Sequence, residues 1–120
     1  MLSLLPSVRI HLCTRPADLR RSFDGLARLV EEYLGGDPLS GHLFVFRNKV
    51  GDRVKLLVWD GDGYVIYYKR LEEGTFRFPA VAADAAGVAI RAADLLMLLD
   101  GVDLASVRRR KRYQRPVATH

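Results

Sequence analysis

Residues Ser40–Pro79 read SGHLFVFRNKVGDRVKLLVWDGDGYVIYYKRLEEGTFRFP, and this stretch decides the fold of the 120-residue chain. Three runs in it are rich in β-branched and aromatic residues, which favour strands: His42–Asn48, Arg53–Trp59 and Tyr64–Leu71. Turn-forming Gly and Asp residues separate the runs by short intervals. The stretch therefore predicts an antiparallel β-meander.

The turns of the meander are Gly51-Asp52 and Asp60–Gly63, both built from residues typical of hairpins. A short fourth strand is expected at Thr75–Phe78, and Pro79 ends it because proline cannot donate to a strand ladder. Placing Trp59 opposite Tyr64 across the second turn, and Asn48 opposite Arg53 across the first, aligns the three long strands.

This alignment gives the sheet two different faces, because successive side chains of a strand point to opposite sides. The first face is aliphatic and suits a covering helix; it holds Leu43, Val45, Val54, Leu56, Val58 and Val65. The second face is aromatic and basic; it holds His42, Phe44, Phe46, Arg53, Lys55, Trp59, Tyr64, Tyr68 and Arg70.

Working outward, Val8–Thr14 predicts a short strand and Pro16–Leu34 an amphipathic helix with one apolar stripe. Ala80–Ala93 is Ala-rich and ambiguous, while Asp94–Leu99 predicts a short helix that Gly101 ends. We expect an α+β fold: an antiparallel meander of four to five strands, covered on one face by the N-terminal helix, with a short C-terminal helix and a basic tail.

Positive charge is concentrated at the C-terminus. The net charge is +5, and six of the 19 Lys and Arg residues lie between Arg108 and His120, a segment without Asp or Glu. The rest of the chain holds 13 basic and 14 acidic residues and is close to neutral. We predict one domain over residues 1–107 and a flexible tail over residues 108–120. Such a tail contacts nucleic-acid phosphates or, alternatively, aids solubility alone.

Catalytic motifs are absent from the sequence. Asp60 and Asp62 fit an ordinary hairpin turn and lack the further oxygen ligands of a calcium loop. Cys13 has no second Cys for a disulfide or metal site, and the three His residues are scattered. The chain contains no phosphate-binding glycine loop, signal peptide or membrane-length apolar run. We expect a cytoplasmic, non-enzymatic protein without cofactor, metal or membrane contact.

The aromatic and basic face is the main candidate for chemistry. Aromatic rings stack on bases while Arg and Lys contact phosphates, so this face resembles a platform for nucleic acid. The alternative is that helices or a second subunit bury it. Basic residues around the first turn either grip a nucleic-acid backbone or protect a sheet edge from aggregation. The candidate nucleic-acid-binding residues are Arg47, Lys49, Arg53, Lys55, Lys69, Arg70, Arg108, Arg109, Arg110, Lys111, Arg112 and Arg115.

Five segments together resemble a known family. They are DLRRSFDGL at Asp18–Leu26, HLFVFRN at His42–Asn48, WDGDG at Trp59–Gly63, YKRLE at Tyr68–Glu72 and FRFP at Phe76–Pro79. This set resembles the TnpB accessory proteins of the insertion-sequence sixty-six family of bacterial mobile elements, which are unrelated to the RNA-guided nuclease of the same name.

The resemblance extends to about residue 103 and implies an accessory role in transposition, with strand cleavage left to an element-encoded transposase. It supplies no catalytic residues. We therefore expect a non-catalytic protein that binds DNA through the basic hairpin and tail. The alternative is a protein-interaction module whose aromatic face docks on the transposase or on a second copy of this chain.

Overall fold

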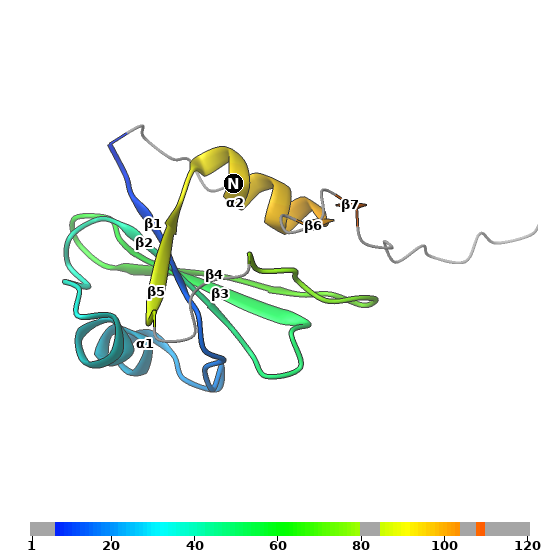
Figure 1. Ribbon diagram of the computed structural model, residues 1–120. Helices are drawn as coiled ribbons and strands as arrows, with labels where there is room; N and C mark the ends of the chain where they lie inside the picture. The colour runs from blue at the N-terminus through cyan, green and yellow to red at the C-terminus, as the bar shows by residue number, and fades with distance from the viewer. Residues whose placement is uncertain (1–6, 80–84, 104–107, 110–120) are drawn as a thin grey trace, which may run out of the picture.

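The computed structural model describes residues 7–79, 85–103 and 108–109. Figure 1 shows a twisted sheet with one helical segment on each side. In chain order the elements are β1 (Ile10–Cys13), α1 (Phe23–Leu29), the π-helical turn η1 (Val30–Leu34), β2 (Leu43–Arg47), β3 (Arg53–Trp59), β4 (Tyr64–Arg70), β5 (Gly87–Ile90), α2 (Ala92–Asp100), β6 (Val102–Asp103) and β7 (Arg108–Arg109).

The meander forms with the predicted register. All seven β3–β4 pairs, from Trp59 with Tyr64 to Arg53 with Arg70, follow the alignment deduced from the second turn. β2 pairs with β3 as expected, and the backbone N–H of Asn48 donates to the Arg53 carbonyl at 3.2 Å. The full order of the five-stranded sheet is β4-β3-β2-β1-β5.

The sheet is mixed, whereas an antiparallel one was predicted. β1 runs parallel to β2, because α1 and η1 carry the chain back across the sheet between them. β5 then joins β1 in antiparallel orientation, within the stretch that the sequence left ambiguous. The fold is α+β with mostly antiparallel pairing, and the predicted strand near the N-terminus is confirmed by β1.

The fourth strand expected at Thr75–Phe78 does not form. The backbone N–H of Phe76 donates to the Gly51 carbonyl at 2.8 Å, but no ladder continues from this bond in the described part of the chain. Instead the Phe76 side chain is buried in the core on the aliphatic face. Burial of this ring fixes the segment against the sheet without strand pairing.

The N-terminal helix is shorter than predicted and begins at Phe23. Upstream, the carboxylate of Asp18 accepts hydrogen bonds from the Arg20 backbone at 3.0 Å and from its guanidinium at 2.8 Å. Such local bonds compete with helical ones, which explains the turn at this point. The last residues of the predicted helix form η1, which ends at Gly35 with φ of 65°.

Both faces of the sheet are covered. α1 and η1 pack on the aromatic face, where their Leu26, Ala27 and Val30 contact Phe44, Phe46 and Leu57. α2 packs on the aliphatic face through Leu95 and Leu98. The N-terminal helix therefore covers the aromatic face, and the aliphatic set receives the C-terminal helix.

The C-terminal helix is confirmed and slightly longer than predicted. The backbone N–H of Arg91 donates to the Asp94 carboxylate at 3.2 Å at its start, and Gly101 ends it with φ of 98°. β6 and β7 follow as a two-stranded pair, so Arg108 and Arg109 of the predicted tail belong to a strand. Residues 110–120, and with them the predicted flexibility, lie outside the described residues.

Candidate nucleic-acid interface

Charge is distributed unevenly along the sheet. The turn between β2 and β3 and the adjoining end of β4 carry Arg47, Lys49, Arg53 and Arg70, which we call the basic end. The opposite end holds the turn with Asp60 and Asp62. The seven residues of β3 run from one end to the other, a distance of about 20 Å.

The carboxylates near the other end also affect the pKa of Tyr64. Burial raises the pKa of this phenol, and the nearby carboxylates of Glu31, Asp24 and Asp37 raise it further. The Asp60 carboxylate accepts a hydrogen bond from the Gly63 backbone at 3.2 Å, as a hairpin turn requires. Polyanion contact is therefore disfavoured at this acidic turn.

Asn48 builds the turn at the basic end. Its side-chain oxygen accepts hydrogen bonds from the backbone N–H groups of Gly51 and Arg53, each at 3.0 Å. Its amide nitrogen donates to Asp52 at 2.7 Å. Gly51 adopts φ of 89°, a conformation that suits glycine. These bonds fix the turn and leave Lys49 exposed at its tip.

Tyr68 lies beside the turn, on the face that α1 covers farther along the sheet. Its side chain is 48% exposed, and its hydroxyl accepts a hydrogen bond from the Arg53 guanidinium at 3.0 Å. The like charges of Arg53 and Arg70 lie opposite each other on β3 and β4. Arg53 uses Tyr68 as its partner while Arg70 pairs with Glu72 at 2.9 Å, which relieves their repulsion.

Lys55 does not present its charge on the surface as predicted. The residue is 8% exposed, and its ammonium donates to the Arg21 carbonyl at 2.8 Å. The same ammonium lies 4.7 Å from the centre of the Tyr68 ring. Lys55 therefore fastens the loop before α1 to the sheet, and this role removes it from the set of phosphate-contacting residues.

Lys69 also has a structural contact. It lies on the opposite face of β4 and donates from its ammonium to the Leu99 carbonyl at 3.1 Å. Leu99 is in the last turn of α2, where the negative end of the helix dipole attracts a cation. This contact ties α2 to β4.

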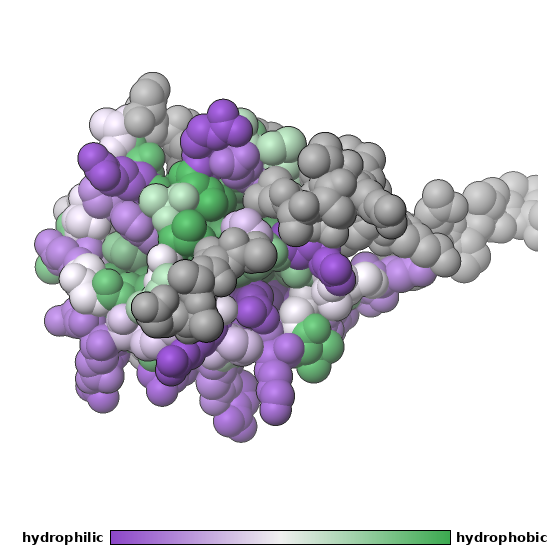
Figure 2. Space-filling model, viewed as in Figure 1, coloured by the Kyte–Doolittle hydropathy of each residue, from purple (hydrophilic) through white to green (hydrophobic). Residues whose placement is uncertain are grey.

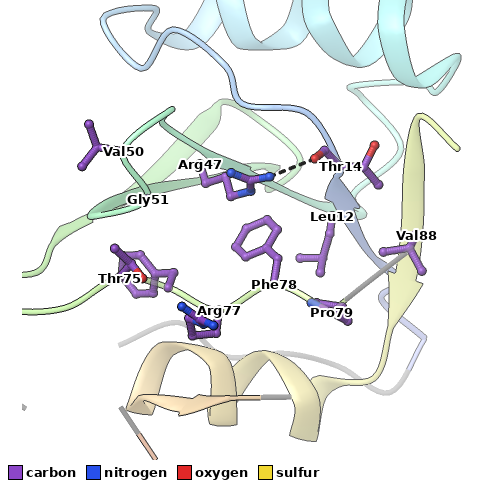
Figure 3. Close-up of a pocket in the computed structure, with 11 residues that line it drawn as sticks. Leu12, Thr14, Arg47, Val50, Gly51, Thr75, Arg77, Phe78, Pro79 and Val88 are labelled. Carbon is purple, nitrogen blue, oxygen red and sulfur yellow. Dashed lines mark hydrogen bonds between the residues drawn. The ribbon is translucent and has the colours of Figure 1, made fainter. Parts of the chain in front are cut away.

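Arg47 faces inward. Its guanidinium donates to the Thr14 carbonyl at 3.1 Å and lies 5.3 Å from the centre of the Phe78 ring. Figure 3 shows this group beside a cavity of about 450 Å³, together with Phe78 and Val88. The buried Nε atom has no hydrogen-bond partner among the described residues. Arg47 thus belongs to this cavity and not to an exposed hairpin surface.

The start of the tail lies on the same side of the molecule as the basic end. The Lys69–Leu99 contact brings the end of α2 to the end of β4, and β6 and β7 follow directly. Figure 1 shows β6 and β7 on the right, the side on which β4 ends. Arg110, Lys111, Arg112 and Arg115 lie outside the described residues.

The surface itself is predominantly polar in the view of Figure 2, with hydrophilic side chains along the lower edge and a smaller apolar area near the centre. The predicted set omitted Tyr68 and the loop at Arg21. The register placed Tyr68 on the correct face, so its position was available from the sequence. The position of Arg21 depends on how α1 packs, for which the sequence carried no signal.

A catalytic or metal centre is not evident in the part of the chain that the structure describes. It contains no group of three or more His, Cys, Asp or Glu side chains placed to hold a metal ion. Cys13 is buried, burial raises the pKa of its thiol, and its Sγ lies 3.4 Å from the Arg15 carbonyl. A protonated, buried thiol is a poor nucleophile. Among the same residues, no helix has the length and apolarity to cross a membrane.

Comparison with known proteins gives a consistent assignment. A family model described as IS66 Orf2 like protein matches residues 8–109, a span that runs from before β1 to the end of β7. The chain is also similar to two proteins of Sinorhizobium fredii over 103 residues each. Uncharacterized protein y4jC is 39% identical, with 86% of this chain and 86% of the relative covered. Uncharacterized protein y4hO is 41% identical, with 83% and 88% covered. No solved structure matches the chain.

Proposed function

This chain belongs to the IS66 Orf2-like family, whose role is accessory to transposition, and we propose that it acts there as a non-catalytic DNA-binding protein. The contact surface consists of the exposed Lys49 and the half-buried Arg53 of the basic end, together with the basic tail. The cations meet DNA phosphates, and a separate transposase performs the strand chemistry.

Segregation of charge is the observation that carries this proposal. Lys49 is exposed at the tip of a turn that Asn48 holds in place, and Arg53 begins the strand that follows it, about 20 Å from the acidic turn at the other end of the sheet. The last described residues, Arg108–Arg109, lie on the same side. DNA approaching this side meets the exposed Lys49, and the carboxylates at the far end disfavour approach from that end.

The chemistry of the contact is phosphate neutralisation. Lys and Arg displace condensed counterions from the duplex, which makes affinity strongly dependent on salt and largely independent of sequence. The exposed Tyr68 ring beside Arg53 offers a flat surface for a sugar or an unpaired base. Phe44 and Phe46 supply no such surface, because α1 and η1 bury them.

The alternative, docking of the transposase on the aromatic face, conflicts with the same burial. A partner could reach Phe44 or Phe46 only after displacing α1 and η1. On this face, docking of the transposase or of a second copy would therefore have to use the exposed Tyr68 in place of Phe44 and Phe46.

A pair of variants tests the proposal. The double variant Lys49→Ala/Arg53→Ala removes the exposed Lys49 and the half-buried Arg53, and we expect it to weaken binding to a 30-base-pair duplex about tenfold or more in low salt. Arg28→Ala is the matched control, because Arg28 is an exposed cation on α1 outside the basic end. Fluorescence anisotropy measures the dissociation constants. Equal affinities for the double variant and the control would contradict a role for the basic end.

A further inference from the structure

We propose that two copies of this protein pair through the outer edge of β4, in antiparallel orientation about a two-fold axis at Tyr67, to form one continuous sheet. The pairing surface lies along the side of the sheet; of the basic end it includes Arg70 and leaves out Lys49 and Arg53. The inference goes beyond the proposed DNA contact and does not rest on it.

The first support is the backbone of β4. In the described part of the chain, β4 is an outer strand of the five-stranded sheet and pairs with β3 alone. The Asp60 N–H donates to the Gly63 carbonyl at 3.0 Å and the Leu71 N–H to the Asp52 carbonyl at 2.7 Å. These two bonds bracket the β3–β4 ladder.

The bracketing bonds fix which groups point outward. They identify the terminal pairs, Trp59 with Tyr64 and Arg53 with Arg70, as non-hydrogen-bonded pairs. Because the ladder alternates, Ile66 is also in such a pair, and so is Tyr68. The N–H and C=O groups of these four β4 residues therefore point away from β3: Tyr64, Ile66, Tyr68 and Arg70.

The second support is the side chains along this edge. The stretch Tyr64–Tyr68 is uncharged, and its Val65 and Tyr67 are 40% and 36% exposed on the face that carries α2. Exposed edge strands are commonly protected by central charges, prolines or bulges. β4 has charges only at one end, in Lys69 and Arg70, and its ladder with β3 is continuous.

The third support is the order of charges along β4, which favours the antiparallel over the parallel orientation for a second copy. One end of β4 carries Lys69 and Arg70 and is followed by Glu72 and Glu73, and the other adjoins the turn with Asp60 and Asp62. Antiparallel pairing brings Lys69 and Arg70 of each copy toward Asp62 of the other and places Glu72, the ion-pair partner of Arg70, opposite Asp62, whereas parallel pairing would place every charge opposite its own copy. The arrangement is isologous and closes at two copies.

A two-fold axis at Tyr67 lets the outward-pointing N–H and C=O groups of β4 in the two copies hydrogen-bond to each other. Ile66 of each copy then lies opposite Tyr68 of the other in a hydrogen-bonded pair, and the two Tyr67 residues face each other in a non-hydrogen-bonded pair. Cα atoms in such a pair lie about 4.5 Å apart, within the range that a disulfide spans. This geometry gives the proposal a sharp test.

Oxidative cross-linking tests the register in the full-length protein. Tyr67→Cys should form a covalent dimer on mild oxidation, visible on a non-reducing gel and reversed by a reductant. Val65→Cys is the matched control: its side chain is on the same face with similar exposure, but it would lie opposite Lys69 and should stay monomeric. The native Cys13 is buried and does not interfere. Failure of Tyr67→Cys to cross-link, or equal cross-linking of both variants, would overturn the proposal.

Sedimentation velocity tests the interface without a covalent bond. The native chain should sediment as a dimer at micromolar concentration, and Tyr67→Lys should weaken dimerisation about tenfold by placing like charges opposite each other. Ala89→Lys, exposed on the far edge strand β5, should leave the dimer intact. A monomeric native chain would overturn the proposal, and this includes the case in which residues 110–120 or a transposase strand occupy β4. A dimer insensitive to Tyr67→Lys would also overturn it.

Discussion

Replacing Phe46 by Ala tests whether the aromatic face is core. Phe46 is 0% exposed, between the sheet and α1. Burying about 200 Å² of aromatic side chain at about 25 cal/mol per Å² stabilises the fold by about 5 kcal/mol. An Ala side chain retains part of this burial, but the cavity that it leaves adds a further cost. We therefore expect Phe46→Ala to lower the free energy of unfolding by about 3–5 kcal/mol.

Urea unfolding followed by circular dichroism measures this change, and thermal unfolding should show a midpoint lower by about 10 °C or more. Tyr68→Ala is the control on the same face, because Tyr68 is half exposed. It loses its hydroxyl bond to Arg53 and the contact with the Lys55 ammonium, for a cost of about 1 kcal/mol. If Phe46→Ala cost less than about 1 kcal/mol, or no more than Tyr68→Ala, the face would be open and our account of the fold would be wrong.

Three further predictions follow from individual contacts. Lys69→Met removes the bond to the Leu99 carbonyl at the end of α2 and should lower the free energy of unfolding by about 1 kcal/mol, measured by urea unfolding. Hydrogen bonds from Arg20 lower the pKa of Asp18 to about 2, so its contribution to stability is present above about pH 4 and is lost as the pH falls through 2. The stability difference between the native chain and Asp18→Asn should therefore shrink over that interval, and a difference that grows on acidification would contradict the sign. The buried Cys13 thiol, whose pKa is raised, should react with a chromogenic disulfide at neutral pH only after denaturant is added; rapid reaction of the native protein would contradict its burial.

The register of the meander could be predicted because its turns are short and chemically distinctive. Asp60–Gly63 and the Asn48–Asp52 turn leave little choice in how β2, β3 and β4 align, and alternation then assigns every side chain to a face. The composition of each face was therefore correct.

Which helix covers which face could not be predicted from the same pattern. Both faces are apolar enough to be buried, and the local sequence of α1 does not specify whether Phe44 or Val45 lies beneath it. The parallel pairing of β1 with β2 is a long-range choice of the same kind. Strand propensity also predicted a strand at Thr75–Phe78 that does not form. The segment is held there by burial of the Phe76 ring and not by pairing with another strand.

The sequence predicted which residues belong to the candidate site, but only some of them are accessible on the surface. Lys49 and Arg53 lie where the hairpin placed them, and Arg53 reaches Tyr68. Lys55, Lys69 and Arg47 are instead bound to backbone carbonyls of distant segments. Sequence spacing cannot reveal these contacts, because each depends on an element that folds against the sheet from elsewhere in the chain.

The salt dependence of DNA binding tests the central claim most directly. If Lys49, Arg53 and four tail cations each neutralise one phosphate, the logarithm of the association constant should fall with the logarithm of salt concentration with a slope of about −5. A chain ending at Arg109 keeps the β6–β7 pair and should give a slope of about −2. A full-length protein that binds duplex DNA with a slope near zero, or does not bind it in low salt, would contradict the account.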